Sequence, residues 1–174
     1  DRIASIFEDA ENATDASYRY DHLELNTEPS KDVKDESLRT RAMLKIQEGC
    51  NQICAYCIVP KVRGREISMR PEYLIESVAS LERMGYQEVV LTGTQLGSYG
   101  FDISGYSLTR LLDEILKNTS IPRVRVSSLQ AHEINTELLS LWSDRRLCQH
   151  FHIPLQSGSD DVLRRMRRRY SASR

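Results

Sequence analysis

Residues 42–57, AMLKIQEGCNQICAYC, join a short apolar segment to three closely spaced cysteines. Residues 42–46 are apolar apart from one lysine, which predicts a strand, and Gly49 closes it. Cys50, Cys54 and Cys57 follow at once with the spacing C-x3-C-x2-C. This stretch therefore predicts a strand that delivers three thiols to the loop at its carboxyl end.

The same order of strand, loop and helix recurs along the rest of the chain. Apolar residues at 74, 75, 78 and 81 have a helical period between Pro71 and Gly85, which suit the start and the stop of a helix. Further strands are predicted over residues 88–91, 124–126 and 151–155, and further helices over residues 108–116, 134–141 and 160–166. Four such units in sequence predict an α/β fold with a parallel sheet and right-handed crossovers.

Polar or glycine-rich clusters follow each predicted strand. They are GCNQICAYC (49–57), GTQLGSYG (93–100), SSLQ (127–130) and LQSGS (155–159). The carboxyl ends of parallel strands meet at one edge of a sheet, where α/β proteins bind their ligands. We therefore expect one ligand site that all four loops share.

The overall composition limits the classes of protein to consider. The chain has 174 residues, of which 40% are hydrophobic and 28% charged, with a net charge of −1. This balance excludes wholesale disorder and a purely electrostatic nucleic-acid binder. The first residues lack the basic and apolar pattern typical of a signal peptide, and no apolar run in the given sequence reaches the length of a membrane span. Four cysteines, three of them clustered, do not form a disulfide framework, so we predict a cytoplasmic location.

The two ends of the chain differ in charge. Residues 1–41 hold eleven acids and six bases, which predicts a linker or extended arm, and we place the folded domain at residues 42–174. From Val162 onward the chain has six arginines and no acid. The chain does not begin with methionine, from which we expect a piece of a longer protein.

Three interpretations of the cysteine triplet remain open on spacing alone. The cysteines share one face of a helix, so they can be small apolar core residues. A structural zinc site needs four ligands, and Cys148 is the only further cysteine. Three thiolates on a [4Fe–4S] cube would leave one iron open to a substrate or cofactor.

The segment IQEGCNQICAYCIVPKVRGREISMRP resembles the cluster loop of radical S-adenosylmethionine (SAM) enzymes, specifically the methylthiotransferase family. GTQLGSYG, SSLQ and HIPLQSGSDDVLRRMRRRY extend the resemblance over roughly residues 42–172. It implies an incomplete (βα) barrel of about four parallel units. It also implies a [4Fe–4S] cluster on Cys50, Cys54 and Cys57 that cleaves SAM to a 5′-deoxyadenosyl radical.

The resemblance also implies roles for other residues. The cofactor-binding positions that it indicates are Tyr56, Gly93, Thr94, Gln95, Ser128, Gln130, Gln156 and Ser157. The related pattern often has an acid where Gln130 stands, but an amide can still hydrogen-bond a ribose or amino group. Arg63 and Arg65 can clamp a substrate carboxylate or phosphate, although solvated surface arginines explain them as well. We predict that His150 and His152 are not metal ligands, and that Cys148 is a plain buried thiol.

The resemblance implies a tRNA methylthiotransferase that modifies C2 of threonylcarbamoyladenosine next to the anticodon. The branches acting on isopentenyladenosine tRNA or on a ribosomal protein are the nearest alternatives, and a non-catalytic zinc-binding RNA-interaction module is an alternative of another class. The family also implies an N-terminal domain with a second [4Fe–4S] cluster, a C-terminal RNA-binding domain, and an electron donor such as a flavodoxin or ferredoxin. An incomplete barrel leaves an unpaired strand edge, so we expect self-association of the chain.

Overall fold

The computed structural model describes residues 40–173. The linker predicted over residues 1–41 lies outside this range except for its last two residues. The strands are β1 (Arg41–Glu48), β2 (Ile67–Ser68), β3 (Glu88–Gly93) and β4 (Arg123–Val126). The helices are α3 (Val59–Val62), α4 (Pro71–Arg83), α5 (Leu108–Asn118), α6 (Thr136–Ser140) and α7 (Asp160–Arg165). Short 3-10 helices span Leu96–Ser98, Ala131–Glu133 and Leu141–Ser143.

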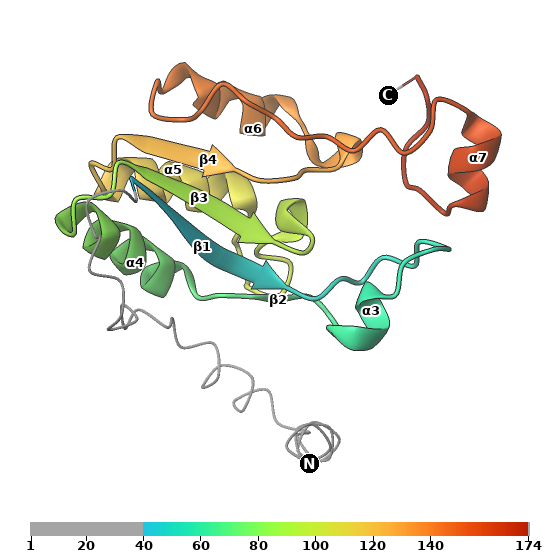
Figure 1. The fold of residues 1–174 in the computed structure, drawn as a ribbon, viewed down its shortest axis with the longest axis horizontal. Helices are drawn as coiled ribbons and strands as arrows, with labels where there is room; N and C mark the ends of the chain where they lie inside the picture. Colours follow the sequence, from blue (N-terminus) through green and yellow to red (C-terminus); the bar gives the residue numbers. More distant parts are fainter. Residues whose placement is uncertain (1–39, 174) are drawn as a thin grey trace, which may run out of the picture. The chain divides into compact units, whose positions relative to one another are not determined.

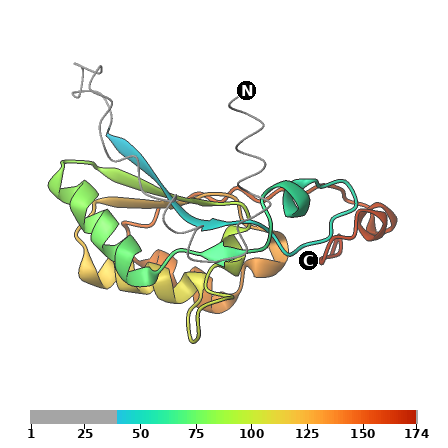
Figure 2. The ribbon, with the colours of Figure 1, turned by 90° about the horizontal axis from the view of Figure 1, so that it is seen from below.

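The described chain folds into one four-stranded sheet with the order β2-β1-β3-β4. β1, β3 and β4 are parallel, and only the two-residue β2 is antiparallel to its neighbour. α4, α5 and α6 cover one face of this sheet, as Figures 1 and 2 show. The predicted α/β fold with an incomplete barrel is therefore confirmed, and β2 is an element that the sequence pattern did not indicate.

The core lies between the sheet and this helical layer. Leu44 of β1, Leu91 of β3 and Leu112 of α5 are completely buried there. α4 begins with Pro71, whose missing N–H suits the first turn of a helix. α5 begins after Ser107, whose hydroxyl accepts a hydrogen bond from the backbone N–H of the residue three positions on. Local capping and apolar spacing thus explain both long helices.

The fourth predicted strand, residues 151–155, is not a regular strand. The chain runs parallel to β4 but pairs with it only through the isolated bridges Val124↔Leu147 and Ser128↔His152. Between them the N–H of His150 bonds to the carbonyl of Cys148 within its own segment, which interrupts the ladder. Pro154 has no N–H to continue it. The third predicted helix is also shorter than expected, with α6 followed by a 3-10 turn.

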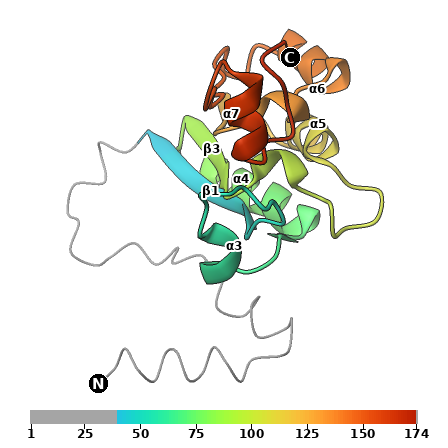
Figure 3. The same cartoon turned by 90° about the vertical axis from the view of Figure 1, so that its right-hand side faces the viewer.

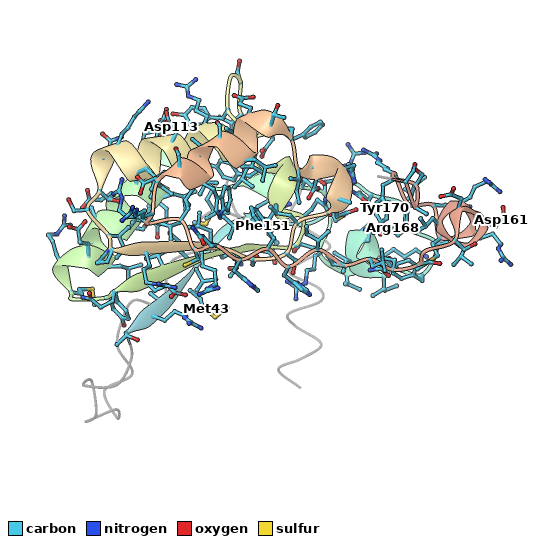
Figure 4. All side chains as sticks on the ribbon, turned by 90° about the horizontal axis from the view of Figure 1, so that it is seen from above. Met43, Asp113, Phe151, Asp161, Arg168 and Tyr170 are labelled. Atoms are coloured by element: carbon cyan, nitrogen blue, oxygen red, sulfur yellow. The ribbon has the colours of Figure 1, made fainter. Side chains whose placement is uncertain are left out.

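The opposite face of the sheet carries no helix of the described chain. Met43 of β1 is 72% exposed on this face, on the other side of the sheet from Asp113 of α5 (Figure 4).

An ion-pair cluster lies at the amino end of the strands. Glu88, which is largely buried, forms ion pairs there with Arg41, Arg123 and Arg125 at 2.9, 3.1 and 2.7 Å. Among the described helices none has the length and apolar character needed to span a membrane.

Candidate functional site

A cavity of about 180 Å³ lies at the carboxyl ends of the parallel strands. The loops after β1, β3 and β4 and the segment from residue 154 to residue 168 form its wall. Figure 3 looks at this end of the sheet, with α7 and α3 toward the viewer. The lining residues are Cys50, Gln52, Cys54, Tyr56, Cys57, Val59, Thr94, Gln95, Leu96, Ser128, Leu129, Gln130, Glu133, Pro154, Gln156 and Arg168. We call this space the cysteine cavity.

The cysteine loop is held against the VRGRE segment by backbone and side-chain hydrogen bonds. The N–H of Cys50 donates to the carbonyl of Gly64 at 3.2 Å. The backbone and side chain of Asn51 exchange three hydrogen bonds with Glu66. Gly49 has φ +74°, and a Cβ there would overlap the carbonyl oxygen of Arg65. Only glycine therefore permits this close approach.

The three cysteines line the same cavity and differ in burial. Cys50 is buried, whereas Cys54 and Cys57 are half-buried. Burial raises the pKa of the Cys50 thiol above its ordinary value, and the N–H of Gln52, which donates to Sγ at 3.4 Å, partly opposes this effect. The loop turns tightly at its outer end, where the N–H of Cys57 donates to the carbonyl of Cys54 at 3.1 Å.

Gln95 links the cysteine loop to the other strand ends. Its backbone N–H donates to Oε1 of Gln47 at 2.8 Å, and its side-chain oxygen lies 3.9 Å from Sγ of Cys50. Its side-chain amide donates to Glu133, and the amide of Gln130 donates to the side-chain oxygen of Gln95. A hydrogen-bonded row of polar groups thus crosses the cavity wall from the first strand to the third parallel strand.

Among the described residues, Glu133 is the only acidic one in this wall. Burial raises the pKa of its carboxyl group, although the backbone N–H of Gln130, which donates to it at 2.8 Å, and the amide of Gln95 oppose the shift. A Cβ at Gly97 would overlap this carboxylate, so glycine gives it room. The side chains of Gln130 and Glu133 form the reciprocal hydrogen bonds of a capping box, which fixes both residues in the wall.

Gln156 reaches the cavity from a strained turn. It has φ +61°, and the N–H of Ser157 closes the turn on the carbonyl of Leu155 at 2.7 Å. The hydroxyl of Tyr170 donates to the carbonyls of Pro154 and Leu155, which fixes the segment before the turn. An unfavourable backbone conformation that the surroundings hold in place is typical of a functional site.

The chain reverses its direction at the end of α7, and this reversal places Arg168 in the wall of the cavity. The N–H of Arg167 bonds to the carbonyl of Arg164, and the N–H of Arg168 bonds to that of Leu163, which is the Schellman pattern. Arg167 has φ +56° in the position that glycine usually occupies. The reversed chain sends Nη1 of Arg168 to 3.4 Å from both Sγ of Cys54 and the hydroxyl of Tyr56.

Most of the predicted site residues meet in this cavity. Those that line it are Cys50, Cys54, Cys57, Tyr56, Thr94, Gln95, Ser128, Gln130 and Gln156. Gly93 instead packs against the side chain of Gln47, and the hydroxyl of Ser157 accepts the N–H of Ser159 ahead of α7. Arg63 and Arg65 are exposed and do not line the cavity, and Arg63 lies 4.0 Å from a carboxylate oxygen of Glu48. A clamp formed by these two arginines therefore stays a prediction.

Sequence reasoning missed three polar wall residues, which are Gln52, Glu133 and Arg168. Glu133 stands three residues after Gln130. A turn after the third parallel strand would bring these two side chains together, and this spacing was the only signal in the sequence for Glu133. Arg168 is one of five arginines within residues 164–169, and nothing local distinguishes it from the others. Cys148 is buried and does not line the cavity, and Nδ1 of His152 lies 2.6 Å from the hydroxyl of Ser128. The roles of Cys148, His150 and His152 stay predictions.

The donor set fits an iron–sulfur cluster. Within residues 40–173 no three cysteine, histidine or acidic side chains are gathered around a point that could hold a single metal ion. The three thiols are instead spread around one cavity, as expected where each thiolate binds a different iron of a cube. Neutral amides, one acid and one arginine complete a wall that can bind a polar cofactor beside the cluster.

The fold and the cavity place the chain in a known class. The profile of the Radical SAM superfamily matches residues 44–174. The chain therefore belongs to the radical SAM superfamily. The matched residues begin in β1 and include the whole cysteine cavity.

Curated relatives narrow the comparison. The chain is 45% identical over 143 residues to the threonylcarbamoyladenosine tRNA methylthiotransferase MtaB of Bacillus subtilis. This alignment covers 80% of this chain and 32% of that protein. It is 44% identical to the MtaB of Thermotoga maritima, and 40% identical to the tRNA-2-methylthio-N(6)-dimethylallyladenosine synthase of Halalkalibacterium halodurans. These alignments cover 78% and 76% of this chain, and 31% and 25% of those proteins. The chain thus spans about a third of the length of these relatives or less.

Solved structures agree on the fold. The radical S-adenosylmethionine methyltransferase TsrM of Kitasatospora setae, with cobalamin and a [4Fe-4S] cluster bound, has a TM-score of 0.60. The similarity covers 76% of this chain and 26% of that chain at 15% identity. At this identity the match supports the incomplete barrel and no finer assignment.

Proposed function

We propose that the chain is the cluster- and SAM-binding core of a cytoplasmic tRNA methylthiotransferase acting on threonylcarbamoyladenosine. The observation that carries this proposal is the convergence of three thiols and a row of hydrogen-bonded amides on one cavity. The 45% identity to MtaB of Bacillus subtilis favours the threonylcarbamoyladenosine substrate. The dimethylallyladenosine synthase is the second candidate, since it aligns over a similar part of this chain at 40% identity.

Cys50, Cys54 and Cys57 would hold a [4Fe–4S] cluster and leave one iron free of protein ligands. When bound, this cluster supplies the electron for the reductive cleavage of SAM. The largely enclosed position of Cys50 shields part of the site from water. Tyr56 would pack near the adenine of SAM, and the half-exposed faces of Cys54 and Cys57 leave a route for an electron donor such as a flavodoxin or ferredoxin.

The row Gln95–Glu133–Gln130 would orient SAM through its polar groups. The carboxyl group of Glu133 suits a cationic amino group or a ribose hydroxyl. Ser128 and Gln156 would complete the pocket at the next strand ends. These groups hold the cofactor in place, and positioning of this kind supplies a large share of a rate enhancement.

The full methylthiotransfer would require more than this chain. The relatives are about three times as long as the part that aligns with it. We expect sulfur insertion to depend on a second cluster held by residues outside the chain, and tRNA recognition to involve further domains. The chain alone should therefore cleave SAM without methylthiolating tRNA.

The first test is anaerobic reconstitution of the chain with iron and sulfide. We expect about four irons and four sulfides per chain, and slow formation of 5′-deoxyadenosine from SAM after reduction. Stoichiometric zinc without sulfide would favour the non-catalytic zinc module instead.

The second test addresses the substrate. Residues 42–173 replace the matching segment of the Bacillus subtilis relative, and the hybrid is expressed in a strain that lacks both that enzyme and the methylthiotransferase acting on isopentenyladenosine. Nucleosides from its tRNA are then analysed by mass spectrometry, with the unchanged relative as the positive control. Return of methylthio-threonylcarbamoyladenosine supports the proposal, and return of methylthio-isopentenyladenosine alone would transfer the chain to the second candidate.

A further inference from the structure

A second and wider cavity, of about 580 Å³, lies next to the cysteine cavity. His132, Arg168, Arg169, Tyr170 and Ser171 line it. We call it the arginine cavity. Arg168 is a wall residue of both cavities, so the two are immediate neighbours. In Figure 4, Arg168 and Tyr170 lie together between the sheet and the far end of α7, where Asp161 is labelled.

Among residues 40–173, no acidic side chain neutralises the positive charge of the arginine cavity. The described lining contains two arginines and no acid. Arg164 is paired with Asp161 at 2.7 Å, on the helix outside the cavity. Arg169 is exposed and makes no hydrogen bond or ion pair with any of residues 40–173. Its guanidinium is therefore available to bind an anion with its planar set of donors.

Two aromatic rings accompany these charges. The rings of His132 and Tyr170 are nearly parallel, with an interplanar angle of 21° and centroids 6.5 Å apart. The guanidinium of Arg168 lies 5.2 Å from the centroid of the Tyr170 ring. Tyr170 is itself fixed through its hydroxyl, which donates to the carbonyls of Pro154 and Leu155. Aromatic rings beside arginines, one of them without an acidic partner among the described residues, are typical of surfaces that bind single-stranded RNA.

We propose that the arginine cavity binds a phosphodiester group of an RNA loop, with Arg169 as its main contact. The nucleotide attached to this phosphate can then reach the cysteine cavity past their shared wall at Arg168. The inference rests on the proposed function for its choice of RNA. It transfers the phosphate-binding role from Arg63 and Arg65, which lie outside both cavities, to the segment after α7.

The test measures binding of a fluorescent anticodon stem-loop RNA to the reconstituted chain over a series of salt concentrations. Arg169→Gln removes one charge in the cavity. Arg165→Gln removes one charge from the last turn of α7, four residues earlier, at an exposed residue that lines neither cavity, and serves as the matched control. We expect Arg169→Gln to weaken binding several-fold and to reduce the slope of log Kd against log salt by about 0.7. Arg165→Gln should change both much less, and Arg169→Lys should restore most of the slope.

Several results would overturn the proposal. One is an equal effect of the two glutamine variants on the slope, which would indicate only a general charge effect. Another is that the unaltered chain does not bind the RNA at low salt. A third is that inorganic phosphate binds with a dependence on Arg169 while RNA binding lacks it, which would define a small-anion site.

The outcome is separable from that of the proposed function. Iron, sulfide and 5′-deoxyadenosine are measured on the same preparations. An intact cluster with no Arg169-dependent RNA binding would reject the arginine cavity alone. RNA binding that depends on Arg169 in a chain that forms no cluster would reject the radical chemistry alone.

Discussion

Nη1 of Arg168 lies 3.4 Å from Sγ of Cys54, although 114 residues separate them in the chain. A second contact joins the same two segments, since the N–H of Ala55 donates to the carbonyl of Met166 at 3.1 Å. The end of α7 thus holds the cysteine loop through both a side chain and the backbone. This relationship places a permanent positive charge beside a thiol that we expect to bind iron.

Replacing Arg168 should therefore change the electronic properties of the cluster. In Arg168→Met we expect the reduction potential of the bound cluster to become more negative, on the order of tens of millivolts, because a cation and a hydrogen bond near a ligating sulfur favour the reduced form. Redox titration followed by EPR measures this shift. Arg165→Met is the control, and a potential equal in the two variants would show that Arg168 does not act on the cluster.

The cysteines should separate into two groups. Alanine at Cys50, Cys54 or Cys57 should abolish the brown chromophore and 5′-deoxyadenosine formation, since each change removes one of only three thiolates in the cavity. Cys148→Ala should keep both, because Cys148 is buried beside β4, where its N–H bonds to Val124 and its carbonyl accepts the indole N–H of Trp142. Iron and sulfide analysis decides the matter. Loss of iron from the Cys148 variant with retention in the Cys54 variant would contradict our ligand assignment.

Glycine at position 167 should stabilise the end of α7. Arg167 has φ +56°, a conformation that costs an L-residue about 1 kcal/mol and glycine almost nothing. Arg167→Gly should therefore slow hydrogen exchange of the Arg168 amide, which bonds to Leu163. Arg165→Gly loses the same charge from a helical position and should speed this exchange, because glycine destabilises a helix by about 1 kcal/mol. If both variants changed the exchange rate of the Arg168 amide equally, the lost charge and not the backbone conformation would explain the change.

Glu88 should contribute stability that depends on pH. The hydrogen bond from Arg125 lowers the pKa of this carboxyl below its ordinary 4.5, with further lowering by Arg123 and Arg41, although burial opposes the shift. The folded state therefore favours the ionised form, and this contribution is complete above pH 4.5 and is lost as the pH falls through the lowered pKa. In urea unfolding, Glu88→Gln should be less stable than the unaltered chain by about 2 kcal/mol at pH 7. The difference should shrink below pH 4.5, and a difference that is constant with pH would contradict this account.

Gly97→Ala should affect the proposed SAM pocket and spare the cluster. The added methyl would overlap the Glu133 carboxylate and displace it from Gln95. We expect the affinity for SAM, measured by equilibrium dialysis with the reconstituted chain, to fall at least several-fold at unchanged iron content. At Gly158 a methyl group meets nothing within 4 Å, so Gly158→Ala should bind SAM as the unaltered chain does. Unaltered affinity in the Gly97 variant would remove Glu133 from the pocket.

The sequence by itself determined the order of elements and the place of the site. The apolar periods of α4 and α5, the buried segments of β1, β3 and β4, and the cysteine spacing are local properties, so they are visible without the fold. The polar clusters after the strands then had to meet, because parallel strands bring their carboxyl ends to one edge. For this reason most of the predicted residues line one cavity.

Only the tertiary structure decided which neighbouring residues enter that cavity. Whether residues 151–155 pair as a strand depended on a hydrogen bond between His150 and Cys148 that removes a donor from the ladder. The choice of Arg168 over four nearby arginines depended on the left-handed conformation of Arg167, which turns the chain back onto Cys54. Such outcomes depend on backbone geometry and on contacts across more than a hundred residues. A local pattern of charge and hydrophobicity carries no information about either.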